Sequence, residues 1–112
     1  MFLGRTKAVK SLSMESAGAQ LLSDSSIALI DVRTKGEYAR GHIPGSIHIP
    51  LDMLFAIDNF VPDKSAKIFV YCLSGARSGQ ACLLLSRSGY SDVTNIGGVT
   101  QWKGELAKAV GA

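Results

Sequence analysis

The sequence predicts a single α/β domain whose core is a mostly parallel β-sheet. Two short runs, Ser26–Val32 and Lys67–Cys72, have the near-continuous apolar character of strands buried on both faces, and such strands occur mainly in parallel sheets. Stretches with helical patterns alternate with these runs, which favours helices packed against the sheet. A chain of 112 residues has the size of one domain and can bury a core without disulfides or bound metal.

Four elements are expected in the first half of the chain. Ser13 can cap a helix over residues 14–22, and the apolar run over 26–32 is the first strand. Residues 37–40 form at most one or two helical turns before a glycine stops them. Residues 47–50 form a short strand that ends at its proline.

Five elements are expected in the second half. Apolar residues at helical spacing predict a helix over 51–60, and the buried strand over 67–72 follows it. A helix over 78–88 ends just before a glycine, which is a common helix stop. We expect a weakly signalled strand over 91–96 and a C-terminal helix over 101–110.

The charge and hydropathy of the chain argue against several functional classes. Twelve Lys and Arg residues stand against nine Asp and Glu, and the resulting net charge of +3 is spread along the chain. A nucleic-acid partner would need these bases clustered on one face, so we expect none, and a weak attraction for small anions is more natural. No apolar stretch approaches the length that crosses a bilayer, so no membrane association is expected. The first ten residues are basic and lack the apolar core of a secretion signal.

The two cysteines, Cys72 and Cys82, lie ten residues apart and form no CxxC pair. Neither His42 nor His48 has metal-site spacing to them, so we expect no metal site. This cysteine usage favours a reducing compartment, and we expect a cytoplasmic protein.

Cys72 is the strongest candidate for a reactive residue. Parallel sheets bind ligands beyond the carboxyl ends of their strands, and Cys72 lies at that end of the run 67–72. Backbone N–H groups of the loop that follows can converge on its sulfur, and Gly75 and Arg77 suit such an anion cradle. The loop residues are Leu73, Ser74, Gly75, Ala76, Arg77 and Ser78. Together these features favour the thiolate, which is the nucleophilic form. The alternative is an inert cysteine that ends a buried strand.

Four residues upstream are candidates for supporting roles: Asp31, Arg33, Glu37 and His42. Asp31 either accepts N–H groups of the loop or simply ends its strand. Arg33 and Glu37 are four residues apart and can form an ion pair that braces the turn. His42 is expected to be a hydrogen-bonded structural residue, because a stabilised thiolate needs no base. Cys82 is expected to be a small buried hydrophobe, and the alternative is a resolving partner for the reactive cysteine.

Four blocks of the sequence resemble the single-domain rhodaneses. The stretch Cys72–Ser78, CLSGARS, is similar to the C-x-x-G-x-R-S active loop of that family. The family's upstream block is similar to three pieces of this chain, DVR over 31–33, EY over 37–38 and GHIPGS over 41–46. Its C-terminal pattern is similar to GY at 89–90 and GG at 97–98 before Trp102. The blocks occur in the right order over roughly residues 11–106, so the match is specific.

The resemblance implies a rhodanese-like three-layer domain, with a central five-stranded sheet flanked by helices, over the chain 1–112. It also implies a sulfurtransferase that uses no cofactor. Cys72 would take a sulfane sulfur from a small donor, carry it as a persulfide and pass it to a thiol or cyanide. The loop lacks the extra cations of thiosulfate-specialised rhodaneses and does not end in the Gly-Val-Thr of mercaptopyruvate enzymes, so thiosulfate and persulfide donors both stay open. Arg33 and Glu37 are expected near the mouth of the pocket, and Trp102 in its wall or beneath it.

Two other functions use similar residues. A cysteine-dependent phosphatase or arsenate reductase has the same Cys…Arg anion cradle, and a rhodanese module can serve as a partner-binding sulfur-relay carrier that docks on a sulfur-acceptor protein. Four residues separate Cys72 from Arg77, whereas related phosphatases resemble Cys-x5-Arg. The shorter ring fits one added sulfur atom better than a phosphate with three equatorial oxygens. A non-catalytic module normally loses the nucleophile, which this chain retains.

Overall fold

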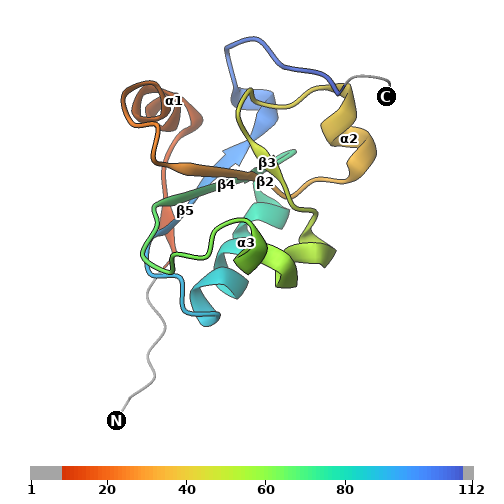
Figure 1. Cartoon of the computed structure of the whole chain (residues 1–112). Coiled ribbons are helices and arrows are strands. Elements are labelled where there is room, and N and C mark those ends of the chain that lie inside the picture. Colours follow the sequence, from red (N-terminus) through yellow and green to blue (C-terminus); the bar gives the residue numbers. More distant parts are fainter. Residues whose placement is uncertain (1–8, 110–112) are drawn as a thin grey trace.

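The computed structural model describes residues 9–109, and within them five strands form one parallel sheet (Figure 1). The order across the sheet is β1-β5-β4-β2-β3, and every neighbouring pair is parallel. The strands are β1 Lys10–Ser11, β2 Ala28–Asp31, β3 Ile47–His48, β4 Ile68–Cys72 and β5 Val93–Gly98. The predicted α/β class with a parallel sheet is therefore confirmed, and β4, which carries the candidate cysteine, is the central strand.

Helices cover both faces of this sheet (Figure 1). Helix α1, Met14–Ser23, packs on one face, while α3, Ala76–Arg87, and the 3-10 helix η1, Leu51–Asn59, pack on the other. Successive side chains of a strand point to opposite faces, so β4 contributes to both halves of the core. Its residues Phe69 and Tyr71 belong to the α1 side, and Val70 and Cys72 belong to the side of α3 and η1. The cysteine therefore faces the helix that follows it in the chain.

The short helix α2, Lys35–Arg40, follows β2 and lies beyond the carboxyl end of the sheet (Figure 1). It begins with a capping box, in which the Thr34 hydroxyl accepts a hydrogen bond from the N–H of Glu37 and the Glu37 carboxylate accepts one from the N–H of Thr34. This reciprocal pair fixes the position of Glu37 at the start of the helix.

The structure differs from the sequence-based expectation at strand β1 and at the helix that follows β3. Strand β1 was not predicted, because its two residues are exposed and carry no apolar pattern; it pairs in parallel with β5. The segment predicted as a helix over 51–60 is helical over 51–59, but with 3-10 hydrogen bonding, as in the bond from the Met53 N–H to the Pro50 carbonyl.

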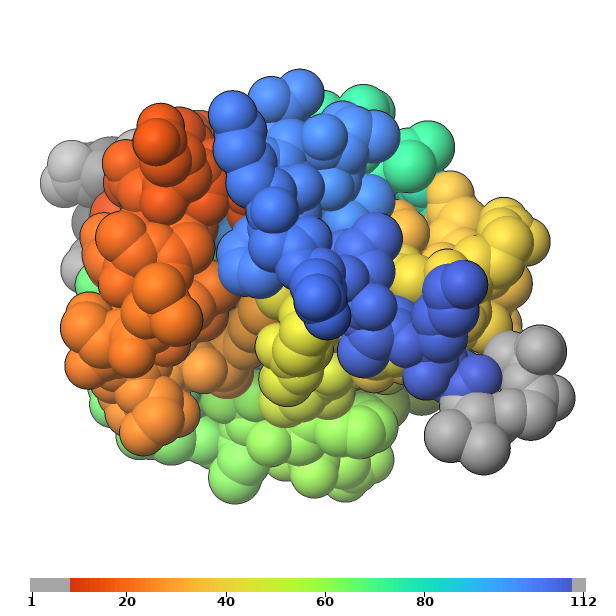
Figure 2. Space-filling model, turned by 90° about the horizontal axis from the view of Figure 1, so that it is seen from above, coloured from red at the N-terminus to blue at the C-terminus, as the bar shows by residue number. Residues whose placement is uncertain are grey.

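The predicted C-terminal helix over 101–110 is wrong for its described residues. After the 3-10 turn η2, Val99–Gln101, the chain crosses the molecule as an extended strap, residues 102–109 (Figure 2). His42 and Ala107 exchange two backbone hydrogen bonds of 2.8 Å, and the Trp102 indole N–H donates to the Glu105 carbonyl at 3.1 Å. These bonds occupy backbone groups that a helix would have used, and Gly104 lowers the helix propensity further. Val110 lies outside the described residues.

The basic start of the chain, residues 1–8, also lies outside the described part. Within residues 9–109, no helix is long and apolar enough to cross a membrane.

Candidate active site

Cys72 is the last residue of β4, and its side chain is buried beneath a tight loop. The residue is 1% exposed, and α3 begins at Ala76, so only three residues separate the strand from the helix. Gly75 makes this turn possible, because its φ of +110° lies in the region that side chains disfavour. The side chains of Leu73, Ser74 and Ala76 are exposed around it.

The sulfur of Cys72 receives several hydrogen bonds from this loop. The N–H of Gly75 donates to Sγ at 3.0 Å, and the Ser78 hydroxyl lies 3.4 Å from it. Burial raises the pKa of the Cys72 thiol and is the largest single influence, but hydrogen bonds from the Ser78 side chain and from the N–H groups of Ser78, Gly75 and Ser74 together hold the pKa below its usual value. The direction agrees with the sequence-based expectation, and the Ser78 hydroxyl gives the largest favourable contribution.

Cys82 lies in a contrasting environment. It is fully buried in the middle of α3, among the apolar residues of the core. Burial, with a smaller contribution from the nearby Cys72, raises the pKa of its thiol to about 12. The two environments therefore shift the pKa values of the two thiols in opposite directions, and the shift at Cys82 favours the protonated thiol.

Arg77 is held by Glu37 rather than by the loop. Its two terminal nitrogens donate to the two carboxylate oxygens of Glu37 at 2.8 and 3.0 Å, joining α3 to α2. The hydrogen bonds from Arg77 are the largest cause that lowers the pKa of Glu37 to about 2. The expected ion pair between Arg33 and Glu37 is wrong, because the Glu37 carboxylate bonds to Arg77 of α3 instead.

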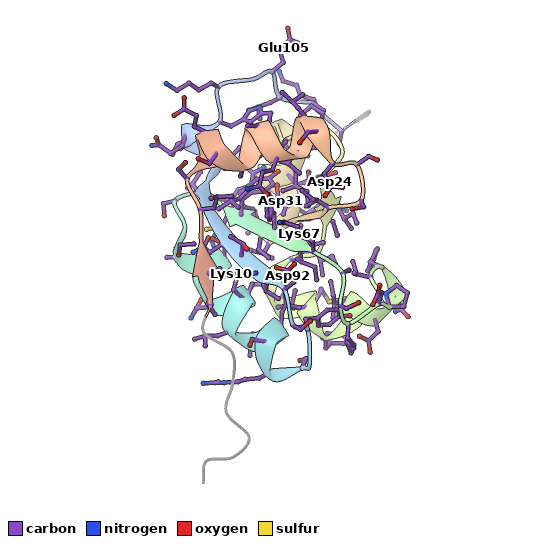
Figure 3. All side chains as sticks on the ribbon, turned by 90° about the vertical axis from the view of Figure 1, so that its left-hand side faces the viewer. Lys10, Asp24, Asp31, Lys67, Asp92 and Glu105 are labelled. Carbon is purple, nitrogen blue, oxygen red and sulfur yellow. The ribbon has the colours of Figure 1, made fainter. Side chains whose placement is uncertain are left out.

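Arg33 pairs instead with Asp31, the last residue of β2. The Arg33 side chain makes three hydrogen bonds of 2.7 to 3.1 Å to the Asp31 carboxylate and donates to the Gly41 carbonyl at 2.7 Å. Asp31 also accepts the N–H of Arg33 at 2.9 Å, and both side chains are buried. Figure 3 shows Asp31 in the interior of the molecule. Of the two roles considered for Asp31, these bonds favour the structural one.

His42 lies in a stack of three rings, of which the third, His48, belongs to β3. The Tyr38 ring stacks on His42 with ring centres 3.7 Å apart and on His48 with ring centres 4.4 Å apart. The His42 Nδ1 lies 2.8 Å from the Tyr38 carbonyl, and its backbone pairs with Ala107 of the strap. These contacts are those of a structural histidine, and no contact links it to the sulfur of Cys72.

The active loop rests on two glycines of β5. Gly98 lies opposite Cys72 in the sheet, and a Cβ placed on it would lie 2.2 Å from the Leu73 carbonyl oxygen. A Cβ on Gly75 would lie 3.5 Å from Gly97. The Gly-Gly pair thus packs directly beneath the loop, whereas Trp102 lies against Gly18 of α1. Trp102 is part of the packing, and the two glycines form the floor of the site.

Asn95 is a functional candidate that the sequence reasoning missed. Its side chain lies within 3.2 Å of Gly75 and 2.7 Å of Ser78, both in the active loop. Asparagine is depleted in strands, so an asparagine inside the expected strand over 91–96 was the sequence feature that could have indicated a special role.

A cavity of about 550 Å³ opens at the side of α3 that carries Arg77. The residues after β2 and the start of η1 form its other walls, including the cationic Lys35 and the apolar Leu51 and Met53. Asp52 also lines the cavity, which therefore combines charges of both signs with apolar surface, and Cys72 is not among its lining residues.

Comparisons with known proteins establish the family of the chain. The chain matches the family model described as Rhodanese-like domain over residues 15–105. It is 36% identical over 95 residues to a "Sulfurtransferase" of Allochromatium vinosum, covering 84% of this chain and 88% of that protein. It is 45% identical over 71 residues to "Thiosulfate sulfurtransferase PspE" of Escherichia coli, covering 62% and 68%.

The fold agrees as well. A solved structure described as "rhodanese with anions from E. coli" superposes with a TM-score of 0.70 at 39% identity, over 74% of this chain and 99% of that one. The Alr3790 protein of Anabaena sp. superposes with a TM-score of 0.81 at 25% identity, over 88% and 93%. The resemblance seen in the sequence blocks is confirmed: the chain belongs to the rhodanese-like domain family.

Proposed function

We propose that the protein is a sulfurtransferase in which the Cys72 thiolate takes a sulfur atom from a small donor such as thiosulfate and passes it to a thiol or cyanide. The sulfurtransferase names of its relatives support the enzyme class. The observation that carries the mechanism is the contrast between the two cysteines. The loop hydrogen bonds lower the pKa of Cys72, whereas burial raises that of Cys82 to about 12.

The reaction is a two-step exchange through one nucleophile. The Cys72 thiolate attacks the outer sulfur of thiosulfate; a new S–S bond forms, the old one breaks, and sulfite leaves with the electron pair. Cyanide or an acceptor thiolate then attacks the outer sulfur of the persulfide, which releases thiocyanate or a new persulfide and regenerates the Cys72 thiolate. The donor supplies the oxidised sulfur and the acceptor receives it, so the cycle consumes no further oxidant or reductant.

The loop suits both halves of this cycle. The N–H of Gly75 and the hydroxyl of Ser78 lie within hydrogen-bond distance of Sγ and stabilise the thiolate before attack. Once the persulfide forms, the negative charge moves to the outer sulfur, and we expect the neighbouring loop amides and the N-terminal end of α3 to stabilise it there. The cavity of about 550 Å³ beside Arg77 does not include Cys72 among its lining residues, and we propose it only as the place for the organic part of a thiol acceptor.

A phosphatase is the competing enzyme class, and the contacts of Arg77 argue against it. In Cys-Arg phosphatases the guanidinium binds the oxygens of the phosphoryl group. Here both terminal nitrogens of Arg77 are bonded to Glu37, and no side-chain nitrogen of Arg77 contacts Cys72. The Cys72 loop is thus built from N–H and O–H donors, which suit one sulfur atom.

Equal amounts of enzyme should be assayed for thiocyanate formation from thiosulfate and cyanide and for hydrolysis of an aryl phosphate. We expect measurable sulfur transfer, abolished in Cys72→Ser, and negligible phosphate release. Phosphate release without sulfur transfer would overturn the proposal. Replacing cyanide with an acceptor thiol tests the second half-reaction in the same samples.

We propose that the whole chain 1–112 works as a single domain in the cytoplasm. Its partners are a small donor, thiosulfate or a persulfide, and a thiol or cyanide acceptor. A sulfur-acceptor protein would make the chain a sulfur-relay carrier. Transfer of labelled sulfur from the loaded protein to another protein, faster than to a free thiol, would support the carrier role.

A further inference from the structure

Asn95 makes three side-chain hydrogen bonds around the active loop. It lies in β5, beside Val70 of β4. Its Oδ1 accepts the Ser78 hydroxyl at 2.7 Å and the N–H of Gly97 at 3.0 Å, and its Nδ2 donates to the Gly75 carbonyl at 3.2 Å. Each hydrogen-bonding group of the amide thus has at least one partner.

The three partners belong to three different parts of the site. Gly97 lies at the irregularity where the register between β4 and β5 shifts, and it forms the floor with its neighbour. Gly75 is the loop residue whose N–H donates to Sγ of Cys72. Ser78 lies in the first turn of α3 and presents its hydroxyl to the same sulfur. One side chain therefore ties the floor, the loop and the helix together.

We propose that Asn95 is a positioning residue for the chemistry of Cys72, because its amide fixes the Gly75 loop and the Ser78 hydroxyl at hydrogen-bond distance from Sγ. The inference rests on the proposed function only in taking Cys72 as the reacting residue. It extends that function by naming the residue that holds the donors in place, and Asn95 itself touches neither the sulfur nor a substrate.

The Ser78 hydroxyl explains why an amide, rather than a carboxylate, occupies this position. The hydroxyl has one proton and three neighbours within reach: Asn95 Oδ1, the Gly75 carbonyl at 3.0 Å and Cys72 Sγ at 3.4 Å. When Cys72 ionises, the proton can turn to the sulfur, since Oδ1 keeps the N–H of Gly97. A carboxylate would hold that proton more tightly and would face the Gly75 carbonyl with no donor.

The test compares Asn95→Ala and Asn95→Asp with the wild-type protein. The rate of alkylation by iodoacetamide is measured against pH, and peptide mass spectrometry assigns the modified cysteine. Asn59→Ala, at the exposed end of η1, is the matched control, because it removes the other asparagine of the chain. Arg77 and Cys82 interact electrostatically with Cys72, and the substitutions change neither.

We expect the midpoint of the Cys72 alkylation rate against pH to rise by about one pH unit in Asn95→Ala, because a lost hydrogen bond to a charged group has an effect of that order. The midpoint should rise further in Asn95→Asp. Asn59→Ala should keep the wild-type midpoint. A merely structural role would lower the melting temperature and leave the midpoint unchanged, and that result in a folded variant would overturn the proposal. If Asn95→Ala does not fold, Asn95→Leu decides, because leucine is close in size to asparagine, carries no charge and makes none of the three hydrogen bonds. Alkylation needs no sulfur donor, so this result is independent of whether the wild-type protein forms a persulfide.

Discussion

Substituting Gly98 with alanine should displace the active loop. A Cβ at this position would lie 2.2 Å from the Leu73 carbonyl oxygen, 2.6 Å from the Ser74 Cα and 2.8 Å from the Leu73 carbonyl carbon. All three atoms are backbone, so no side-chain rotation can relieve the contact. Restoring an ordinary separation of about 3.5 Å requires the loop or the strand to move by about 1 Å. That shift is comparable to the tolerance of the hydrogen bond from the Gly75 N–H to Cys72 Sγ.

A misplacement of about 1 Å in an active site can cost on the order of 100-fold in rate, and overpacking costs about 1–3 kcal/mol of stability. We therefore expect Gly98→Ala to lose sulfur transfer by 10- to 100-fold, an order-of-magnitude estimate on the same basis, and to raise the alkylation midpoint of Cys72. The assay is kcat/KM for thiosulfate with cyanide, alongside a melting curve that shows the protein is folded. Gly36→Ala is the matched control, because the nearest atom to its Cβ is the flexible end of Arg40 at 3.5 Å. Wild-type transfer and an unchanged midpoint in Gly98→Ala would refute the idea that this glycine is the floor of the loop.

Three further outcomes are expected. Glu37→Gln should lower the free energy of unfolding by about 1 kcal/mol at pH 7, since the pair with Arg77 is partly exposed. The pKa of Glu37 is lowered from 4.5 to about 2 in the folded protein, so the stability that its carboxylate contributes is complete above its unfolded pKa and is lost as the pH falls toward 2. Denaturation curves should therefore show that the difference in free energy of unfolding between the variant and the wild type narrows over that pH range. Cys82→Ala should keep most of the sulfur transfer and lose about 1 kcal/mol of stability from the core, whereas a collapse of activity with an unchanged melting curve would indicate a resolving role. Inserting one glycine between Gly75 and Ala76 should weaken sulfur transfer by widening the loop, and an assay that finds full activity would show that loop length does not set the reaction.

The sequence predicts the parts of this fold that local patterns encode. Strands β2 and β4 are apolar along their length, and the helices α1 and α3 have capping residues or glycine stops, so their positions follow from neighbouring residues. Strand β1 has two exposed residues and exists only because β5 offers it an edge. The strap that replaces the expected last helix depends on the His42 backbone, more than sixty residues away, which no local pattern reveals.

The same distinction applies to the site. The loop from Cys72 to Ser78 is continuous in sequence, and its cysteine, glycine and arginine were predicted as an anion cradle. The partner of Arg77 was not, because Glu37 is 40 residues away and sequence proximity favoured Arg33. Asn95 is likewise brought to the loop by the parallel pairing of β4 with β5. Local chemistry is visible in the sequence, and the choice of long-range partners is not.

The intact mass of the reduced protein after incubation with thiosulfate tests the central claim most directly. The account predicts a gain of one sulfur atom, located on Cys72 by peptide mapping, removed by cyanide and absent in Cys72→Ser. Sulfur carried by Cys82, sulfur retained in Cys72→Ser, or no added sulfur with thiosulfate and with a persulfide donor would contradict it.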